Sequence, residues 1–387
     1  MNPAASSTDA CRICGRPFFA EPLFRFVGMP AVAQNFPKAE DAAADRGTDF
    51  EVVQCSGCGV VQLTCGPVAY YRDVIRAAAV SPEMAEHRRC QFAEFVSAHR
   101  LRGRPVIEIG CGNGEYLRWL AEAGAAAHGL EHNEAAVDAC RRQGLPVQQG
   151  FVESADTRLA GGPFDGFVML SCLEHLPDVN GVLTGIRANL SPSAVGLVEV
   201  PNFDMILAEK TASEFMTDHL FYFTRETLET TLRLNGFEVE DCRPTWHDYI
   251  LTATVRTRSP VAVAEFHSVT TAIRRDIDAF LAKFPPRSVV VWGAGHQALA
   301  ALALHELADR IAYVVDSAPF KQNLLTPATH IPIRSPAALK SDPGVRAVIV
   351  MGASYSDEIS RMLRSDYSPA LAVAILRPSH LEAEAAS

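Results

Sequence analysis

The stretch Pro105–Leu117 reads PVIEIGCGNGEYL, and it predicts a strand, a tight turn and a helix in succession. The apolar run Val106–Ile109 favours a buried parallel strand, and a helix is expected from Glu115. Glycines between them permit positive φ and close approach of a ligand, while the free amides at the helix start can bind it. Dinucleotide enzymes use similar turns, so the turn alone is weak evidence. Its three glycines are Gly110, Gly112 and Gly114.

Acidic residues flank this turn on both sides. Glu108 lies two residues before the first glycine, and E-x-G-x-G-x-G after a strand resembles the pattern of class I methyltransferases. That resemblance implies S-adenosylmethionine (SAM) as cofactor. Glu131 follows a second predicted strand, Ala127–Leu130, where an acid can accept hydrogen bonds from ribose hydroxyls. The adenine is expected beside Phe151, after a short strand at Val147–Gln149.

Two later loops carry the candidates for the reaction itself. After a predicted strand at Phe164–Leu170, residues 171–178 read SCLEHLPD, and the LEHLPD phrase recurs in class I methyltransferases beside the methyl group. Ser171 is therefore assigned to the cofactor. A further strand is expected at Val195–Val200. The later segment 217–224, TDHLFYFT, holds Asp218 and His219, which suit proton transfer because a histidine pKa lies near working pH. The alternative, in which His219 packs a loop and the aromatic residues form core, stays open.

Composition restricts the class of protein. The 387 residues suggest two or three domains, and the net charge of −10 argues against binding of nucleic acid. No apolar stretch approaches the roughly 18 residues of a membrane span, and the N-terminus has no charged start followed by an apolar segment. We therefore expect no membrane association and a cytoplasmic location.

Cysteine spacing predicts a metal site near the N-terminus. Two C-x-x-C-G knuckles supply four thiols, and two knuckles make the closed tetrahedral set of a structural Zn²⁺ site. A redox pair is the competing interpretation, but no thioredoxin-like strand context accompanies either motif. The predicted ligands are Cys11, Cys14, Cys55 and Cys58.

The segment before the first glycine turn is predicted to contain a helix, and the C-terminal segment is predicted to contain a second Rossmann-like unit. Ser81 followed by Pro82 predicts a helix start in the connector, whose tyrosines either pack or cover the active site. Near the C-terminus, after a predicted helix at Phe266–Phe284, a strand at Val289–Trp292 leads into GAGHQA; a further strand is expected at Ile311–Val315. Asp316 lies 23 residues after the first glycine of that turn, and by itself this pattern suggests NAD.

The order of these parts resembles the sugar C-methyltransferase family of deoxysugar biosynthesis. Its markers are the two knuckles with CGVVQL at 58–63, the first glycine turn, HLPD at 175–178, and Asp218-His219 before Tyr222-Phe223. VDSAPFKQ at 315–322 and TPATHIPI at 326–333 are more specific, because ordinary NAD folds lack them. The resemblance implies an α/β protein with four parts: a zinc-binding domain at 1–66, a helical connector at 67–104, a SAM-dependent methyltransferase domain at 105–258, and a Rossmann-like substrate-binding domain at 259–387.

The resemblance also implies a reaction and its residues. Family members methylate the carbon beside the ketone of a thymidine-diphosphate-linked 4-keto sugar, which needs a base and a stabilised enolate. By this likeness His219 is the base, while His175 and Asp218 orient the sugar or stabilise the enolate. The second glycine turn then serves the substrate nucleotide or the structure rather than NAD. The residues expected to contact the nucleotide-linked sugar are Tyr71, Tyr222, Gly293, Gly295, His296, Lys321 and His330.

Two segments depart from the family pattern. The usual Tyr-x-Glu-His is Met216-Thr217-Asp218-His219 here, and a serine-rich stretch is replaced by RDVIR at 72–76. An O- or N-methyltransferase of the same architecture is therefore an open alternative, with an NAD-dependent oxidoreductase as a third. We expect a monomer or a weak homo-oligomer.

Overall fold

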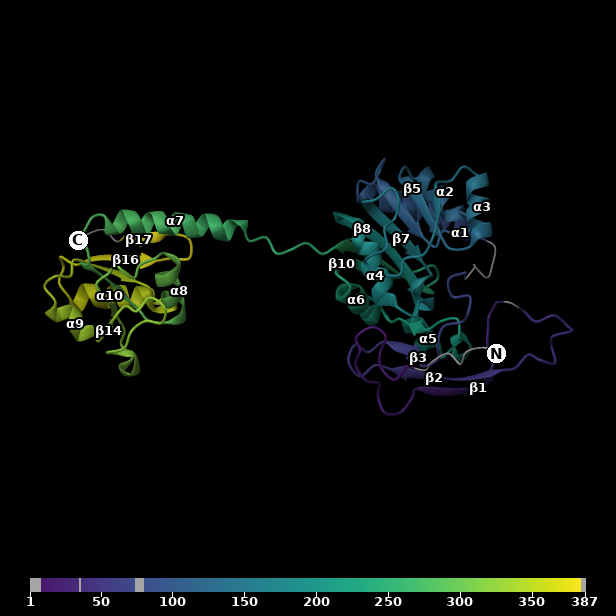
Figure 1. Ribbon diagram of the computed structural model, residues 1–387, viewed down its shortest axis with the longest axis horizontal. Helices are drawn as coiled ribbons and strands as arrows, with labels where there is room; N and C mark the ends of the chain where they lie inside the picture. The colour runs from purple at the N-terminus through teal and green to yellow at the C-terminus, as the bar shows by residue number, and fades with distance from the viewer. Residues whose placement is uncertain (1–7, 35, 74–79, 384–387) are drawn as a thin grey trace. The chain divides into compact units, whose positions relative to one another are not determined.

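The computed structural model describes residues 8–34, 36–73 and 80–383. Residues 74–76, which belong to the RDVIR segment that departs from the family pattern, thus lie outside the described residues. The chain divides between Ser259 and Pro260 into two compact units, which are described separately below (Figure 1). In the described part of the chain, no helix is long and apolar enough to cross a membrane.

A seven-stranded sheet organises the first unit, in the order β10-β11-β8-β7-β4-β5-β6. Strands β6 to β8 are parallel with β4 and β5, whereas β11 runs antiparallel to both β8 and β10. The strands predicted for this region are present, and two of them, Val147–Gln149 and Phe164–Leu170, have the predicted bounds. The strands are β4 (Pro105–Ile109), β5 (Ala126–Glu131), β6 (Val147–Gln149), β7 (Phe164–Leu170), β8 (Leu190–Pro201), β10 (Phe237–Thr245) and β11 (Ile250–Thr257).

Helices cover both faces of this sheet, because successive strand residues point to opposite sides. Val106 packs with residues of α1 and α2 and with Cys140 of α3. Its neighbour Ile107 packs with residues of α4 and α6 on the other face. Figure 1 shows these two helical layers. The helices are α1 (Pro82–Ala98), α2 (Glu115–Glu122), α3 (Glu134–Arg142), α4 (Val179–Ala188) and α6 (Arg225–Leu234). The predicted cap is confirmed, since the Ser81 side chain accepts a hydrogen bond from the amide of Met84.

A small antiparallel sheet brings the N-terminal segment to the loop that contains Asp218 and His219. Its order is β1-β2-β3-β9, and β9 (Phe221–Tyr222) immediately follows the candidate residues Asp218 and His219. The pairing of Gln62 with Phe221 therefore fixes that loop against the N-terminal region. Helix α5 (Phe203–Glu209) contributes Phe203 to the apolar core under this sheet. The other strands are β1 (Phe24–Met29), β2 (Thr48–Gln54) and β3 (Val61–Leu63).

The second unit is another α/β sheet, of order β14-β13-β12-β15-β16-β17. The predicted strand Val289–Trp292 is confirmed as β12, whereas the one expected at Ile311–Val315 shortens to β13 (Val314–Val315), because its ladder with β12 begins only at Val314. The predicted helix is α7 (Ala264–Leu281). The remaining elements are α8 (His296–Leu304), β14 (Ile333–Arg334), α9 (Pro336–Ser341), β15 (Ala347–Val350), α10 (Ser356–Asp366), β16 (Ala372–Leu376) and β17 (Leu381–Ala383).

Candidate functional site

The first glycine turn adopts backbone conformations that require glycine. Gly110, Gly112 and Gly114 have φ of +73°, +53° and +84°. A Cβ on Gly110 would lie 2.7 Å from the sulfur of Cys172, and one on Gly114 would lie 2.5 Å from Leu145 Cδ1. Conformation thus disfavours side chains at all three positions, crowding adds to this at Gly110 and Gly114, and the turn presents bare backbone at the end of β4.

Glu131 holds this turn in place from the neighbouring strand. Its Oε2 accepts a hydrogen bond from the amide of Gly112 at 2.8 Å, and its Oε1 accepts one from the amide of Asn133 at 2.8 Å. An ionised carboxylate has about four acceptor positions, so each oxygen keeps one for a ligand hydroxyl. Glu108 lies in β4 and is only 3% exposed.

A cavity opens beside the turn, with a volume of about 610 Å³ that includes open solvent at its mouth. Six predicted site residues line it, whereas Glu108, Gly112 and Gly114 do not. Among the lining residues that sequence reasoning missed are Met169, Cys172 and His132. The six are Tyr71, Gly110, Glu131, Phe151, Ser171 and His175.

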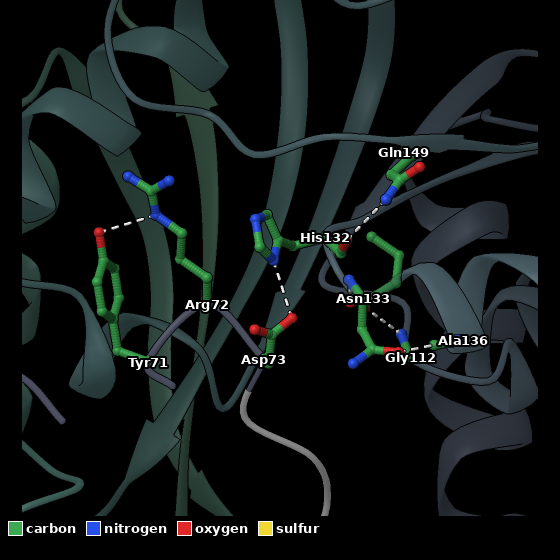
Figure 2. Close-up of polar contacts among 9 residues, drawn as sticks. Tyr71, Arg72, Asp73, Gly112, His132, Asn133, Ala136 and Gln149 are labelled. Carbon is green, nitrogen blue, oxygen red and sulfur yellow. Dashed lines mark hydrogen bonds and ion pairs between the residues drawn. The ribbon is translucent and has the colours of Figure 1, made fainter. Parts of the chain in front are cut away.

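The connector closes over one side of the cavity. The guanidinium of Arg72 lies 5.0 Å from the ring centre of Phe151, donates to the hydroxyl of Tyr71 at 2.9 Å, and pairs with Glu153 at 2.6 Å. Asp73 contacts Nδ1 of His132 at 2.8 Å, and His132 directly follows Glu131 in the chain (Figure 2). The ring of Phe151, which is predicted to lie beside the adenine, is therefore covered by the Arg72 side chain of the connector. Nothing in the local sequence of residues 71–73 predicts the contacts with His132, Phe151 and Glu153, because these three residues lie far along the chain.

Two histidines and the backbone of Asp218 meet beside this cavity. Nδ1 of His175 donates to the backbone carbonyl of Asp218 at 2.7 Å, and the rings of His175 and His219 form an edge-to-face pair with centres 4.8 Å apart. Burial and the neighbouring His175 lower the pKa of His219 to about 3. The His219 ring is therefore neutral at physiological pH, with a lone pair available. Of the pair, only His175 lines the cavity.

The side chain of Asp218 is engaged by the N-terminal region rather than by the histidines. Its Oδ1 accepts from the Tyr70 hydroxyl at 2.7 Å, and its Oδ2 accepts from the amide of Ala33 at 2.9 Å. Tyr222 is 3% exposed and outside the cavity lining; its hydroxyl accepts from the amide of Met216 at 2.9 Å. Sequence reasoning missed the role of Tyr70, which joins the connector to this loop.

The four predicted metal ligands converge. Sulfurs of Cys11 and Cys58 lie 3.7 Å apart, and those of Cys14 and Cys55 lie 3.4 Å apart. Thiolates bound tetrahedrally to one Zn²⁺ at about 2.3 Å would be roughly 3.8 Å apart, so the cluster has the size for such an ion. A hydrogen bond with Cys58 lowers the pKa of Cys11 to about 5, which favours a thiolate.

The second unit brings its predicted residues to one end of its sheet. Gly293 follows β12 with φ of +118°, and a Cβ there would lie 2.7 Å from the carbonyl oxygen of Met351. Lys321 pairs with Asp316 at 3.0 Å, and Asp316 also accepts from the amides of Ala294 and Ala318 at 2.8 Å. Gly295 caps α8, and the side chains of His296 and His330 are exposed.

The first unit has the fold of a class I, Rossmann-like methyltransferase, with its cavity at the glycine turn. Residues 84–241 match the family model of a methyltransferase domain, and residues 253–378 match that of the C-methyltransferase C-terminal domain. The chain therefore joins a methyltransferase domain to the C-terminal domain of C-methyltransferases, which confirms the family resemblance seen in the sequence.

Similar proteins include the C-methyltransferase NovU of Streptomyces niveus, 24% identical over 62% of this chain and 59% of NovU. A ubiquinone biosynthesis O-methyltransferase of Methylococcus capsulatus is 36% identical over 26% of this chain and 44% of its own length. The matched region thus spans less than two thirds of these relatives. Among solved structures, the magnesium protoporphyrin IX methyltransferase of Synechocystis PCC 6803 with bound SAH aligns with a TM-score of 0.38 and 17% identity, over 49% of this chain and 93% of that protein.

Proposed function

We propose that this protein is a SAM-dependent C-methyltransferase that acts on the carbon beside the ketone of a nucleotide-linked 4-keto sugar. The observation that carries the proposal is the His175–His219 pair beside the cavity of the methyltransferase domain, in a chain that also has the C-methyltransferase C-terminal domain. SAM would supply an electrophilic methyl group. Glu131, Gly110, Ser171 and Phe151 are the residues that would hold it.

The chain's own residues would generate the nucleophile. A C–H bond beside a ketone is only weakly acidic, so a base must take the proton while the enolate oxygen is stabilised. His219 is the proposed base, because its low pKa keeps the ring unprotonated before the substrate arrives. A low pKa also makes it a weak base, so enolate stabilisation is essential. We assign that part to His175, which lines the cavity.

Exchange of the substrate proton tests this assignment without methyl transfer. The protein is incubated in deuterated water with a thymidine-diphosphate 4-keto sugar, and deuterium beside the ketone is measured by NMR. His219→Asn should abolish exchange, whereas the control His267→Asn, at an exposed position on α7, should leave it unchanged. Neither exchange nor methylation across a panel of such sugars would contradict the proposal.

One observation favours a second candidate, an O- or N-methyltransferase. The carboxylate of Asp218 is engaged by Tyr70 and Ala33, whereas the family pattern has a longer acid at this position. The acceptor contacts can therefore differ from those of the sugar C-methyltransferases. Locating the transferred methyl group by carbon NMR distinguishes the two, because a methyl on oxygen or nitrogen would rule out the C-methyltransferase.

We further propose that the four cysteines hold a structural Zn²⁺. The set is closed and leaves no position for a substrate, so the ion would stabilise the N-terminal fold. Metal analysis of the purified protein should find one zinc per chain, and a chelator should expose residues 11–65 to hydrogen exchange. A zinc-free protein with unchanged protection in that segment would contradict this proposal.

A further inference from the structure

A third acceptor lies beside the histidine pair. Glu174 lies in the short 3-10 helix Leu173–His175 and is 1% exposed. Its Oε2 is buried and has no hydrogen-bond partner among the described residues. Its Oε1 lies 3.8 Å from Nε2 of His175. A buried carboxyl oxygen without a partner is costly, so a proton or a positively charged ion at this position would stabilise it.

The ring nitrogen of His175 that lies near Glu174 is Nε2. A backbone carbonyl can only accept, so the hydrogen bond to Asp218 places the ring proton of His175 on Nδ1. In the neutral ring, Nε2 then carries the lone pair, 3.8 Å from Oε1 of Glu174. Metal-binding histidines have this arrangement, because a carbonyl on the second nitrogen fixes both tautomer and ring orientation.

His219 completes the group from the loop before β9. One ligand atom from each of Glu174, His175 and His219 lies within 4.8 Å of the other two. Donor atoms bound to one ion at about 2.1 Å can be at most about 4.2 Å apart. The pair at 3.8 Å already meets this limit, and the other separations, all within 4.8 Å, need to shorten only slightly. His219 lies outside any helix or strand, where a side chain is less constrained.

We propose that Glu174, His175 and His219 bind one divalent transition-metal ion, and that this ion blocks His219 as a base. Two imidazoles and one carboxylate suit Zn²⁺, Co²⁺ and Ni²⁺ better than Mg²⁺ or Ca²⁺, which prefer oxygen ligands. The ion would satisfy Glu174 and occupy the lone pair that must take the substrate proton. Binding stands on the geometry alone, whereas the blocking effect rests on the proposed function.

Cobalt titration of the full, zinc-loaded chain tests binding. Zn²⁺ exceeds Co²⁺ in affinity, so the cysteine cluster keeps its zinc while added Co²⁺ reports on other sites. We expect one equivalent of Co²⁺ by calorimetry, with a visible spectrum that lacks sulfur-to-cobalt charge transfer. Glu174→Gln should weaken binding at least about tenfold, since it removes the charge and little of the shape. Circular dichroism and SAM affinity check that the variant is folded.

A matched control separates this site from surface binding. His247 and Glu83 form an exposed pair 3.1 Å apart, so His247→Asn should leave the Co²⁺ affinity unchanged. The proposal is overturned if no such equivalent binds, or if Glu174→Gln and His219→Asn bind Co²⁺ as tightly as the unaltered protein. The buried carboxylate would then hold a proton only.

The exchange assay tests the blocking effect. Added Co²⁺ should suppress deuterium exchange in the unaltered protein and in His247→Asn, at the concentration at which calorimetry shows binding. Unchanged or faster exchange at saturating Co²⁺ would overturn the blocking role. If no sugar exchanges even without Co²⁺, the proposed function fails, while the calorimetric result still decides the metal site.

Discussion

The chain contains the same strand–turn–acid arrangement twice, and the two copies differ in how the acid is engaged. In the first, Glu131 accepts from the amides of Gly112 and Asn133. In the second, Asp316 accepts from the amides of Ala294 and Ala318 in the equivalent way. Only Asp316 is also neutralised by a lysine, Lys321, at 3.0 Å.

Space at the two turns differs as well. The first turn borders a cavity of about 610 Å³ that Gly110 and Glu131 help to line. At the second, a Cβ on Gly293 would lie 2.7 Å from the carbonyl oxygen of Met351, whereas one on Gly295 would meet no atom within 4 Å. Both acids therefore accept from backbone amides, but they differ in what lies beside them: a cavity at Glu131 and the Lys321 ammonium at Asp316.

The largest expected difference between the turns concerns cofactor affinity. Glu131→Gln should weaken SAM binding about 10- to 100-fold, because hydrogen bonds to a charged group contribute about 1.5–3 kcal/mol. The matched change Asp316→Asn should leave SAM affinity unchanged. Calorimetry with SAM measures both. Equal losses in the two variants would show that the second turn also serves the cofactor.

The next effect concerns the stability of the second turn. Gly293→Ala forces an alanine to φ of +118° and places its Cβ against Met351, which should destabilise the second unit by about 1–3 kcal/mol. Gly295→Ser is the control, since Gly295 has φ of −81°, no atom within 4 Å of an added Cβ, and a capping position that serine favours. Hydrogen exchange of the β12 and β15 peptides reports on each variant. Equal protection in both would contradict the argument from crowding.

Both turns could be predicted from the sequence, because the signal is local. A short apolar run that ends in glycine and is followed by an acid further on indicates strand, turn and partner, and β12 has the bounds predicted for it. The strand β8 extends beyond its predicted range to Leu190, because Leu190 pairs with Phe164 although the intervening residues, Ser-Pro-Ser-Ala, have no strand pattern. Periodicity cannot reveal such a pairing.

The residues that join distant segments could not be predicted in this way. The pairing of β3 with β9, the bond from Tyr70 to Asp218 and the contact of Asp73 with His132 each link parts of the chain that share no local pattern. Glu174 was visible only as part of the LEHLPD phrase, and nothing in that phrase shows that its carboxylate is buried without a partner. Motifs therefore locate the site, while the contacts within it depend on tertiary packing.

The lysine at the second turn predicts a pH effect. Burial raises the pKa of Asp316, but the amides of Ala318 and Ala294 and the Lys321 ammonium outweigh it, so the net pKa is lowered. An acid whose pKa is lowered in the folded state stabilises the fold at pH values above its unfolded-state pKa of about 3.9. This stabilisation is lost as the pH falls through the folded-state pKa. Lys321→Met should therefore destabilise the second unit by up to about 1 kcal/mol at pH 7 and by less near pH 3. Hydrogen exchange of peptides from 312–334 measures this, with the exposed Lys283→Met as control. A loss that is equal at both pH values would show that Lys321 acts by packing.

The smallest effect should come from the connector, which has no counterpart at the second turn. Asp73 and His132 are 40% and 37% exposed, so their contact contributes about 0.2–1 kcal/mol, and Asp73→Asn should weaken SAM binding about two- to fivefold. The exposed Asp41→Asn serves as control. A double-mutant cycle with His132→Gln tests whether the contact itself matters: the double variant should bind SAM about as well as either single one. Additive losses would mean that the two residues act separately on the cofactor, and that the connector does not cover it through this pair.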